Sequence, residues 1–139
     1  MSSDTNRRLL TTIFDSLAAG ETRPFADAMS EDFRWRFAGE WSWARDWGNG
    51  KREVRRNLLA PLMAQFRDYR CTAQEIIAAG DRVVVRAKAD ARTVRGERYP
   101  QAYCYVFRVE HARLTEVIEY CDTALVERVL ALPDLGEPL

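Results

Sequence analysis

Two apolar runs joined by a short polar turn occupy residues 99–121 and constrain the fold more than any other part of the sequence. Residues 99–109 are rich in aromatic and β-branched side chains, residues 110–113 interrupt the run, and residues 114–121 resume it. This pattern is typical of a β-hairpin. One face of the first strand would carry Gln101, Tyr103, Tyr105 and Phe107, and the other Ala102, Cys104, Val106 and Arg108. Since both faces are largely apolar, we expect helices over one face and a second sheet, such as that of a partner subunit, against the other.

The residues before the hairpin predict helices and further strands. Apolar residues from Leu9 to Leu17 recur at helical spacing, and Gly20 follows as a stop. Pro24 suits the start of a short second helix. The remaining expected elements are a strand at 31–38, a helix at 51–66 that Pro61 kinks or restarts, strands at 69–79 and 82–94, and a short helix at 123–132.

Two segments each allow more than one interpretation. Residues 39–50 form a loop with three tryptophans, which would cover a cavity mouth, lie at a subunit contact, or pack as a satellite of the core. In the strand at 82–94, a charged row alternates with an apolar one. That row, Arg86, Lys88, Asp90 and Arg92, either faces solvent or faces inward, where Lys88 and Asp90 would pair.

Two short motifs in the hairpin carry a family resemblance. Tyr99-X-Gln101-X-Tyr103 and Glu119-Tyr120-Cys121-Asp122, with the element order above, resemble the SnoaL-like branch of the nuclear transport factor 2-like and ketosteroid isomerase-like superfamily. The resemblance implies an α+β cone, in which a curved, mixed, mostly antiparallel sheet and three packing helices surround an apolar pocket. It also implies one domain over residues 1–139, with frayed tails at 1–3 and 133–139, and a homodimer formed through the outer sheet face.

Charge and composition exclude several function classes. Lysine plus arginine and aspartate plus glutamate both number 21, so no net charge favours nucleic acid or a membrane surface. The N-terminus lacks an apolar signal core, so we expect a cytoplasmic protein. The three cysteines lie in strand-like runs and predict small core residues of a reducing compartment. One histidine and the absence of ligand spacing predict no metal site and no cofactor.

The resemblance points to Asp122 as the principal catalytic residue. In SnoaL-like cyclases the matching aspartate is the acid/base of ring closure, whereas Asp122 could equally cap the following helix. Lys88-X-Asp90 with Asp122 is similar to part of the epoxide hydrolase pattern, which makes Asp90 a second candidate acid. The position of the isomerase base is matched by Phe37 or its neighbours, which argues against that isomerase chemistry.

The aromatic residues define a candidate substrate pocket. We expect its walls to contain Trp35, Phe37, Tyr103, Tyr105 and Tyr120, with Gln101 and Lys88 as polar contacts. The sequence therefore predicts a cofactor-free enzyme that acts on small hydrophobic molecules, including polycyclic ones. Cyclase, isomerase, dehydratase and epoxide hydrolase chemistry all stay open. The alternative is a non-catalytic ligand-binding or assembly module of the same fold.

Overall fold

A curved six-stranded sheet forms the body of the computed structural model, which describes residues 2–133. The strands lie in the order β2-β1-β6-β5-β4-β3, and all neighbouring pairs are antiparallel except β1 and β6. The mixed, mostly antiparallel sheet is therefore confirmed. The strands are β1 (Met29–Phe37), β2 (Arg45–Asn49), β3 (Phe66–Ala79), β4 (Arg82–Thr93), β5 (Ala102–Glu110) and β6 (Arg113–Cys121).

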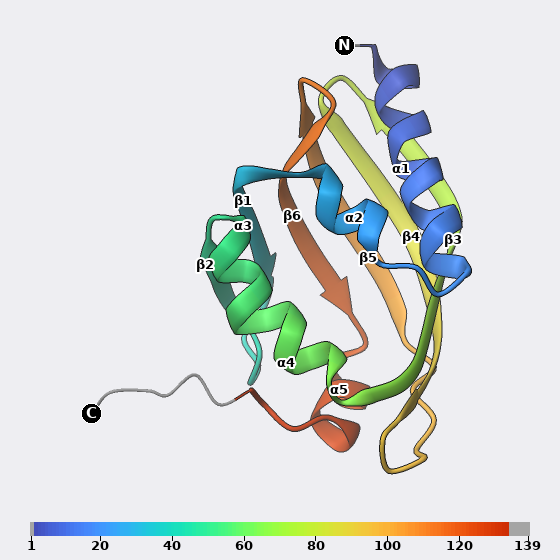
Figure 1. Ribbon diagram of the computed structural model, residues 1–139, viewed down its shortest axis with the longest axis vertical. Helices are drawn as coiled ribbons and strands as arrows, with labels where there is room; N and C mark the ends of the chain where they lie inside the picture. Colours follow the sequence, from blue (N-terminus) through green and yellow to red (C-terminus); the bar gives the residue numbers. More distant parts are fainter. Residues whose placement is uncertain (1, 134–139) are drawn as a thin grey trace.

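The helices lie across the concave face of this sheet (Figure 1). Helix α1 (Ser3–Ala18) buries Leu10, Ile13, Phe14 and Leu17, as its apolar spacing predicted. The hydroxyl of Ser2 accepts a hydrogen bond from the Thr5 amide and so caps α1. Residues 2 and 3 thus belong to the helix start rather than to a frayed tail. The expected tails at residue 1 and residues 134–139 lie outside the described residues.

The second and third helices cover the other half of the concave face. Helix α2 (Arg23–Ala28) has Pro24 in its first turn. The third helix is divided into α3 (Lys51–Val54), a π-helical turn η1 (Arg55–Leu59) and α4 (Ala60–Met63). The π-helical turn ends two residues before Pro61, the residue at which the sequence predicted a kink or a restart. The predicted end at residue 66 was wrong, because Phe66 already begins β3.

Strand β4 shows the clearest alternation in the molecule. Its residues from Val83 to Thr93 are buried at every second position, and the charged residues between them are exposed. The charged row therefore faces solvent on the convex side. The salt bridge of Arg86 is made to Glu75 across the strand pair, rather than within the row.

A strand within the tryptophan segment was not predicted. Strand β2 pairs with β1, and Trp43 and Trp47 are both buried. Phe37 stacks on Trp41 and Trp43, with ring centroids 5.8 and 6.1 Å apart. Core packing is the interpretation that holds for Trp47, whereas Trp43 is buried and also lines the cavity described below.

The chain ends in a helix set at the foot of the sheet. Helix α5 (Thr123–Val129) follows β6 directly and buries Leu125, Val126 and Val129. The predicted turn between β5 and β6 is a tight one, with His111 and Ala112 both in the left-handed region. In the described part of the chain, every helix is too short or too polar to cross a membrane.

Candidate active site

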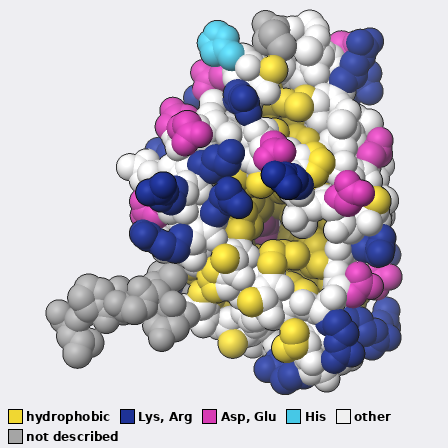
Figure 2. Space-filling view, in the orientation of Figure 1, with side chains coloured by type: hydrophobic (Ala, Val, Ile, Leu, Met, Phe, Trp, Pro, Cys, Tyr) yellow, Lys and Arg dark blue, Asp and Glu magenta, His cyan; other side chains and the backbone are white. Residues whose placement is uncertain are grey.

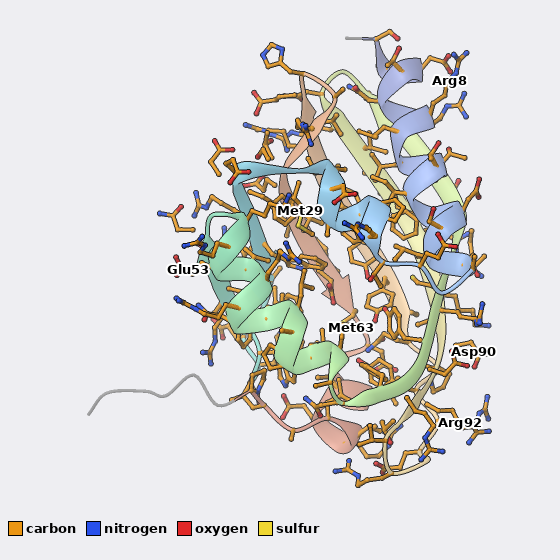
Figure 3. All side chains as sticks on the ribbon, viewed as in Figure 1. Arg8, Met29, Glu53, Met63, Asp90 and Arg92 are labelled. Carbon is orange, nitrogen blue, oxygen red and sulfur yellow. The ribbon has the colours of Figure 1, made fainter. Side chains whose placement is uncertain are left out.

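A cavity of about 750 Å³ opens between the concave sheet face and the helices. Apolar and aromatic side chains form most of its walls, and Figure 2 shows a hollow lined by hydrophobic residues with basic side chains beside its mouth. Met29 from β1 and Met63 from α4 both line it (Figure 3). The volume is sufficient for a ligand of several fused rings, since small-molecule sites are commonly about 300–1,000 Å³.

Four of the predicted pocket residues lie in the cavity wall. They are Trp35, Phe37, Tyr103 and Tyr105. Each occupies an inward position of β1 or β5 and is almost completely buried. Trp35 also stacks on Phe25 of α2, with the ring centroids 5.5 Å apart, which ties this wall to the helices.

Three other predicted contacts lie elsewhere. Tyr120 is 51% exposed on the convex face, because it alternates with inward-facing neighbours on β6. Lys88 is exposed on the same face, in β4. Gln101 is fully buried but does not line the cavity. Its amide accepts from the backbone N–H groups of Asp122 and Ala102 and donates to the Asp122 carbonyl and the Tyr99 hydroxyl. Gln101 thus fixes the junction between β6 and α5.

The two aspartates predicted as catalytic acids are not among the cavity-lining residues. Asp122 caps α5, where its Oδ1 accepts a hydrogen bond from the Leu125 amide at 3.2 Å. The cap interpretation of this residue is therefore the one that the structure supports. Asp90 lies on the convex face, pointing away from the helices in Figure 3. An outward position on β4 cannot bring its carboxylate to the cavity.

Glu119 is the acid that the fold places in the cavity wall. It lies on β6 directly between Phe37 of β1 and Tyr105 of β5, and only 5% of its surface is exposed. Trp35 Nε1 donates a hydrogen bond to Glu119 Oε1 at 3.2 Å. Burial raises the pKa of Glu119 to about 8, against the opposing effect of hydrogen bonds from Trp35 and Cys121. A carboxyl with that pKa exchanges protons near neutral pH.

Two tyrosines supply neutral hydrogen-bond donors to the same cavity. The hydroxyl groups of Tyr69 and Tyr103 lie 2.7 Å apart, and both side chains line the wall. Burial holds the pKa of each phenol well above 10.0, so both keep their protons. One proton lies between the two oxygens, which leaves the pair one further O–H donor.

Sequence reasoning singled out the motif that contains Glu119 but selected the wrong member of it for the pocket. A signal was present, because Val117, Glu119 and Cys121 form the inward series of β6 and Glu119 is the only acid in it. No three His, Cys, Asp or Glu side chains among residues 2–133 are grouped as metal ligands would be.

A curved mixed sheet with helices across its concave face and a cavity between them defines the nuclear transport factor 2-like class of α+β proteins. Residues 10–117 match the family model described as SnoaL-like domain, so the chain belongs to the SnoaL-like family. No curated protein matches the chain.

Solved structures support the same fold at low sequence identity. A protein of unknown function from Burkholderia pseudomallei, described as NTF2-like, is 20% identical, with a TM-score of 0.75 over 94% of this chain and 99% of that chain. A candidate SnoaL-like polyketide cyclase from Jannaschia is 16% identical, with a TM-score of 0.75 and 95% coverage of both chains. TerC, crystallised with polyporic acid, is 17% identical, with a TM-score of 0.73 over 89% of this chain and 96% of that chain.

Proposed function

We propose that this protein is a cofactor-free enzyme that moves a proton on a small hydrophobic molecule, with Glu119 as the acid/base. The observation that carries the proposal is one buried carboxyl group, with a pKa of about 8, in the wall of an aromatic cavity. A group with such a pKa can take a proton and return it at neutral pH. The fold supports this proposal by analogy, because one structural neighbour is named as a candidate polyketide cyclase and another was crystallised with polyporic acid.

The proposed chemistry starts with proton abstraction beside a carbonyl group. The Glu119 carboxylate takes the proton from carbon, and the negative charge develops on the carbonyl oxygen. The Tyr69 and Tyr103 pair donates a hydrogen bond to that oxygen, in surroundings where water does not compete. Glu119, now protonated, returns the proton to another carbon or to the product of ring closure. Every step uses groups that line the cavity.

A single buried acid favours some reaction types over others. Glu119 is the one buried acid among the described residues that line the cavity. Isomerisation and aldol-type ring closure need one group that both accepts and returns a proton. Epoxide hydrolysis by water needs further groups to hold and activate that water. We therefore propose isomerase or cyclase chemistry.

Exchange of carbon-bound protons tests the proposal without knowledge of the natural substrate. Nuclear magnetic resonance would follow deuterium uptake from heavy water into a panel of polycyclic ketones that begins with β-tetralone. We expect the wild type to accelerate uptake, with kcat/KM rising to a plateau through about pH 8 as Glu119 ionises. Glu119→Gln should lose roughly a hundredfold or more, the usual effect of a general base.

Asp15→Asn is the matched control, since it removes an exposed acid of α1 that does not line the cavity, and it should retain wild-type exchange. An unchanged rate in Glu119→Gln would contradict the role of Glu119. A wild type that accelerates exchange in no member of the panel would instead favour a non-catalytic ligand-binding module.

We also propose that the active form is a homodimer joined through the convex sheet face. Ile77, Val84, Val106 and Ile118 form one row across β3, β4, β5 and β6, and each is the direct register partner of the next. The described helices lie on the other face (Figure 1). Charges of both signs surround the row, among them Arg86, Asp90 and Glu116, so two copies offer each other complementary partners.

A further inference from the structure

Four basic side chains stand at the mouth of the cavity. Lys51, Arg52, Arg55 and Arg56 all line it, and they come from α3 and the first turn of η1. Figure 2 shows basic side chains clustered beside the opening of the hydrophobic hollow. Charged residues of a helix usually face solvent, yet the fold places this segment at the entrance to the cavity.

The helix presents these charges in a fixed order along the entrance. Arg52, Arg55, Arg56 and Leu59 are separated by three, one and three residues, which places them on one helical stripe. Beyond Leu59 the lining continues with Leu62 and Met63. The stripe is therefore cationic at its N-terminal end and apolar at its C-terminal end, and both ends border the same cavity.

Among the residues that the structure describes, the charges on this stripe are not paired in salt bridges, and Glu53 of the same helix lines a separate hollow with Arg34 and Asp46. Within residues 2–133, none of the four basic side chains forms a salt bridge, whereas Arg34 pairs with Asp46 and Arg86 with Glu75. Two acids, Glu31 and Glu119, line the cavity with them. Glu119 is buried in the wall, so the only exposed acid of the lining is Glu31.

This arrangement has a local cost that a bound anion would relieve. Arg52 and Arg56 are four residues apart, and like charges at that spacing destabilise a helix. Guanidinium groups donate two parallel hydrogen bonds to carboxylate, sulfonate or phosphate oxygens, and their geometry fits these anions. A ligand that brings one negative charge to the entrance would be attracted by four cations against one exposed carboxylate.

We propose that the cavity takes amphipathic anions: the rings of the ligand lie among the aromatic walls, and its anionic group lies at the mouth against Arg52, Arg55 and Arg56. This deepens the proposed function, on which it rests, by naming the substrate class. The shared chemistry is a flat apolar body with a carboxylate, phosphate or comparable oxyanion at one end. The reacting carbons then lie inward, on the side of Glu119.

A pair of fluorescent probes isolates the contribution of the anionic group. Anilinonaphthalene sulfonate and N-phenylnaphthylamine share the same rings, but only the first carries a negative charge. Both brighten when they leave water, so fluorescence titration gives the Kd of each. We expect the wild type to bind both probes and to bind the sulfonate more tightly, with an advantage that shrinks as salt is raised from 20 to 500 mM, values chosen to span about 20 to 4 Å of screening length.

The variant Arg52→Gln/Arg55→Gln/Arg56→Gln removes three of the cations and keeps side chains of similar length. We expect its Kd for the sulfonate to rise about tenfold, which corresponds to roughly 1.4 kcal/mol. Its Kd for the neutral amine should change less than twofold. The control Arg7→Gln/Arg8→Gln removes two exposed cations from α1 that do not line the cavity, and it should leave both constants unchanged.

Displacement of the neutral amine distinguishes the sources of the anion. Naphthoate and naphthyl phosphate would compete for the same cavity, with naphthol as the uncharged reference. The proposal expects at least one of the two anions to displace the probe at lower concentration than naphthol does. The stronger of the two identifies the carboxylate or the phosphate class.

The outcomes separate this proposal from the one on which it rests. If the amine binds but the triple variant keeps the full affinity for the sulfonate, or loses both probes equally, the anion site is overturned and the cavity remains. If neither probe binds the wild type, both ideas fall. If Glu119→Gln loses proton exchange and keeps unchanged probe binding, the role of Glu119 as the acid/base is supported. The anion site is then judged only from the probe titrations of the triple arginine variant.

Discussion

The aromatic rings around the carboxyl group of Glu119 change the free energy of its protonation in the folded protein. Glu119 receives hydrogen bonds from Trp35 and Cys121 and otherwise faces Phe37 and Tyr105 across the neighbouring strands. Little polar surface is present to stabilise a negative charge, so the neutral form is favoured in the folded state. The same environment therefore makes the stability of the folded protein sensitive to pH.

Replacing Glu119 with glutamine should remove this sensitivity. The ordinary pKa of a glutamate is 4.5, and that of Glu119 in the folded protein is about 8. Between these values the folded state keeps a proton that the unfolded chain has lost, so the free energy of unfolding falls as pH rises, by up to roughly 1.4 kcal/mol per unit. The contribution is fully present below pH 4.5 and is lost above pH 8. Glu119→Gln should lack this decline.

Urea denaturation at pH 4, 6 and 8, values chosen to bracket the window, measures the difference. We expect the stability advantage of Glu119→Gln over the wild type to grow from the lowest pH to the highest. Glu110→Gln changes an exposed acid beside the β5–β6 turn and should follow the wild type. Parallel curves for Glu119→Gln and the wild type would show that Glu119 titrates normally in the folded protein.

The contrast between Glu119 and Asp122 shows which site residues the sequence can predict. The motif that contains both residues indicates the right stretch, and the inward positions of Trp35, Phe37, Tyr103 and Tyr105 follow from strand alternation. Strand alternation also places Glu119 inward, but Asp122 lies one residue past the end of β6, where alternation no longer applies. The pKa of Glu119 depends on burial against Trp35 and Phe37 of β1, which is distant in sequence, so no local pattern contains it.

At the level of secondary structure, two side chains hold the junction between β6 and α5. Gln101 forms hydrogen bonds to the backbone on both sides of Asp122, and the Asp122 carboxylate caps the helix. An unsatisfied amide at a helix start costs about 1 kcal/mol when the capping side chain is removed. Asp122 is therefore expected to act through the stability of α5.

Substitutions at Asp122 distinguish this structural role from a catalytic one. Asp122→Ala should lower the free energy of unfolding by about 1 kcal/mol, because the Leu125 amide loses its acceptor. Asp122→Ser keeps a capping oxygen and should recover most of that loss. At a temperature where both variants are folded, each should retain at least half of the wild-type rate of proton exchange. A loss of exchange in Asp122→Ser with stability retained would return Asp122 to the catalytic group.

Elements in which apolar residues recur at regular spacing were predictable from the sequence. Elements that depend on tertiary partners were not. Helix α1 and strand β4 follow directly from apolar spacing, and both were correct. Strand β2 has five residues and no alternation of its own, and it exists because β1 offers it an edge. The third helix ends at Met63, although the helical spacing of apolar residues continues to Phe66, because Phe66 belongs to the long strand β3.

At the scale of the whole molecule, the sheet separates two kinds of apolar surface. The concave face encloses the cavity together with α2 and the third helix, while the convex face carries the aliphatic row of Ile77, Val84, Val106 and Ile118. Ile77 is 54% exposed, which is unusual for an aliphatic residue within a strand. Sheet-on-sheet packing would remove this row from water.

A charge placed at the β6 end of that row should dissociate the proposed dimer without closing the cavity. In Ile118→Lys the introduced cation would meet the apolar row of the other subunit, and burying it there costs more than the contact gains. We expect light scattering after size-exclusion chromatography to give twice the chain mass of 16.0 kDa for the wild type and one chain mass for Ile118→Lys. Val94→Lys is the control, because Val94 is an exposed aliphatic residue, at 55%, that lies beyond the end of β4. A wild type that elutes as a single chain at micromolar concentration, or an Ile118→Lys variant that stays dimeric, would place the interface elsewhere.

Binding of N-phenylnaphthylamine measured on the same samples shows whether the cavity is complete in one subunit, as its lining residues indicate.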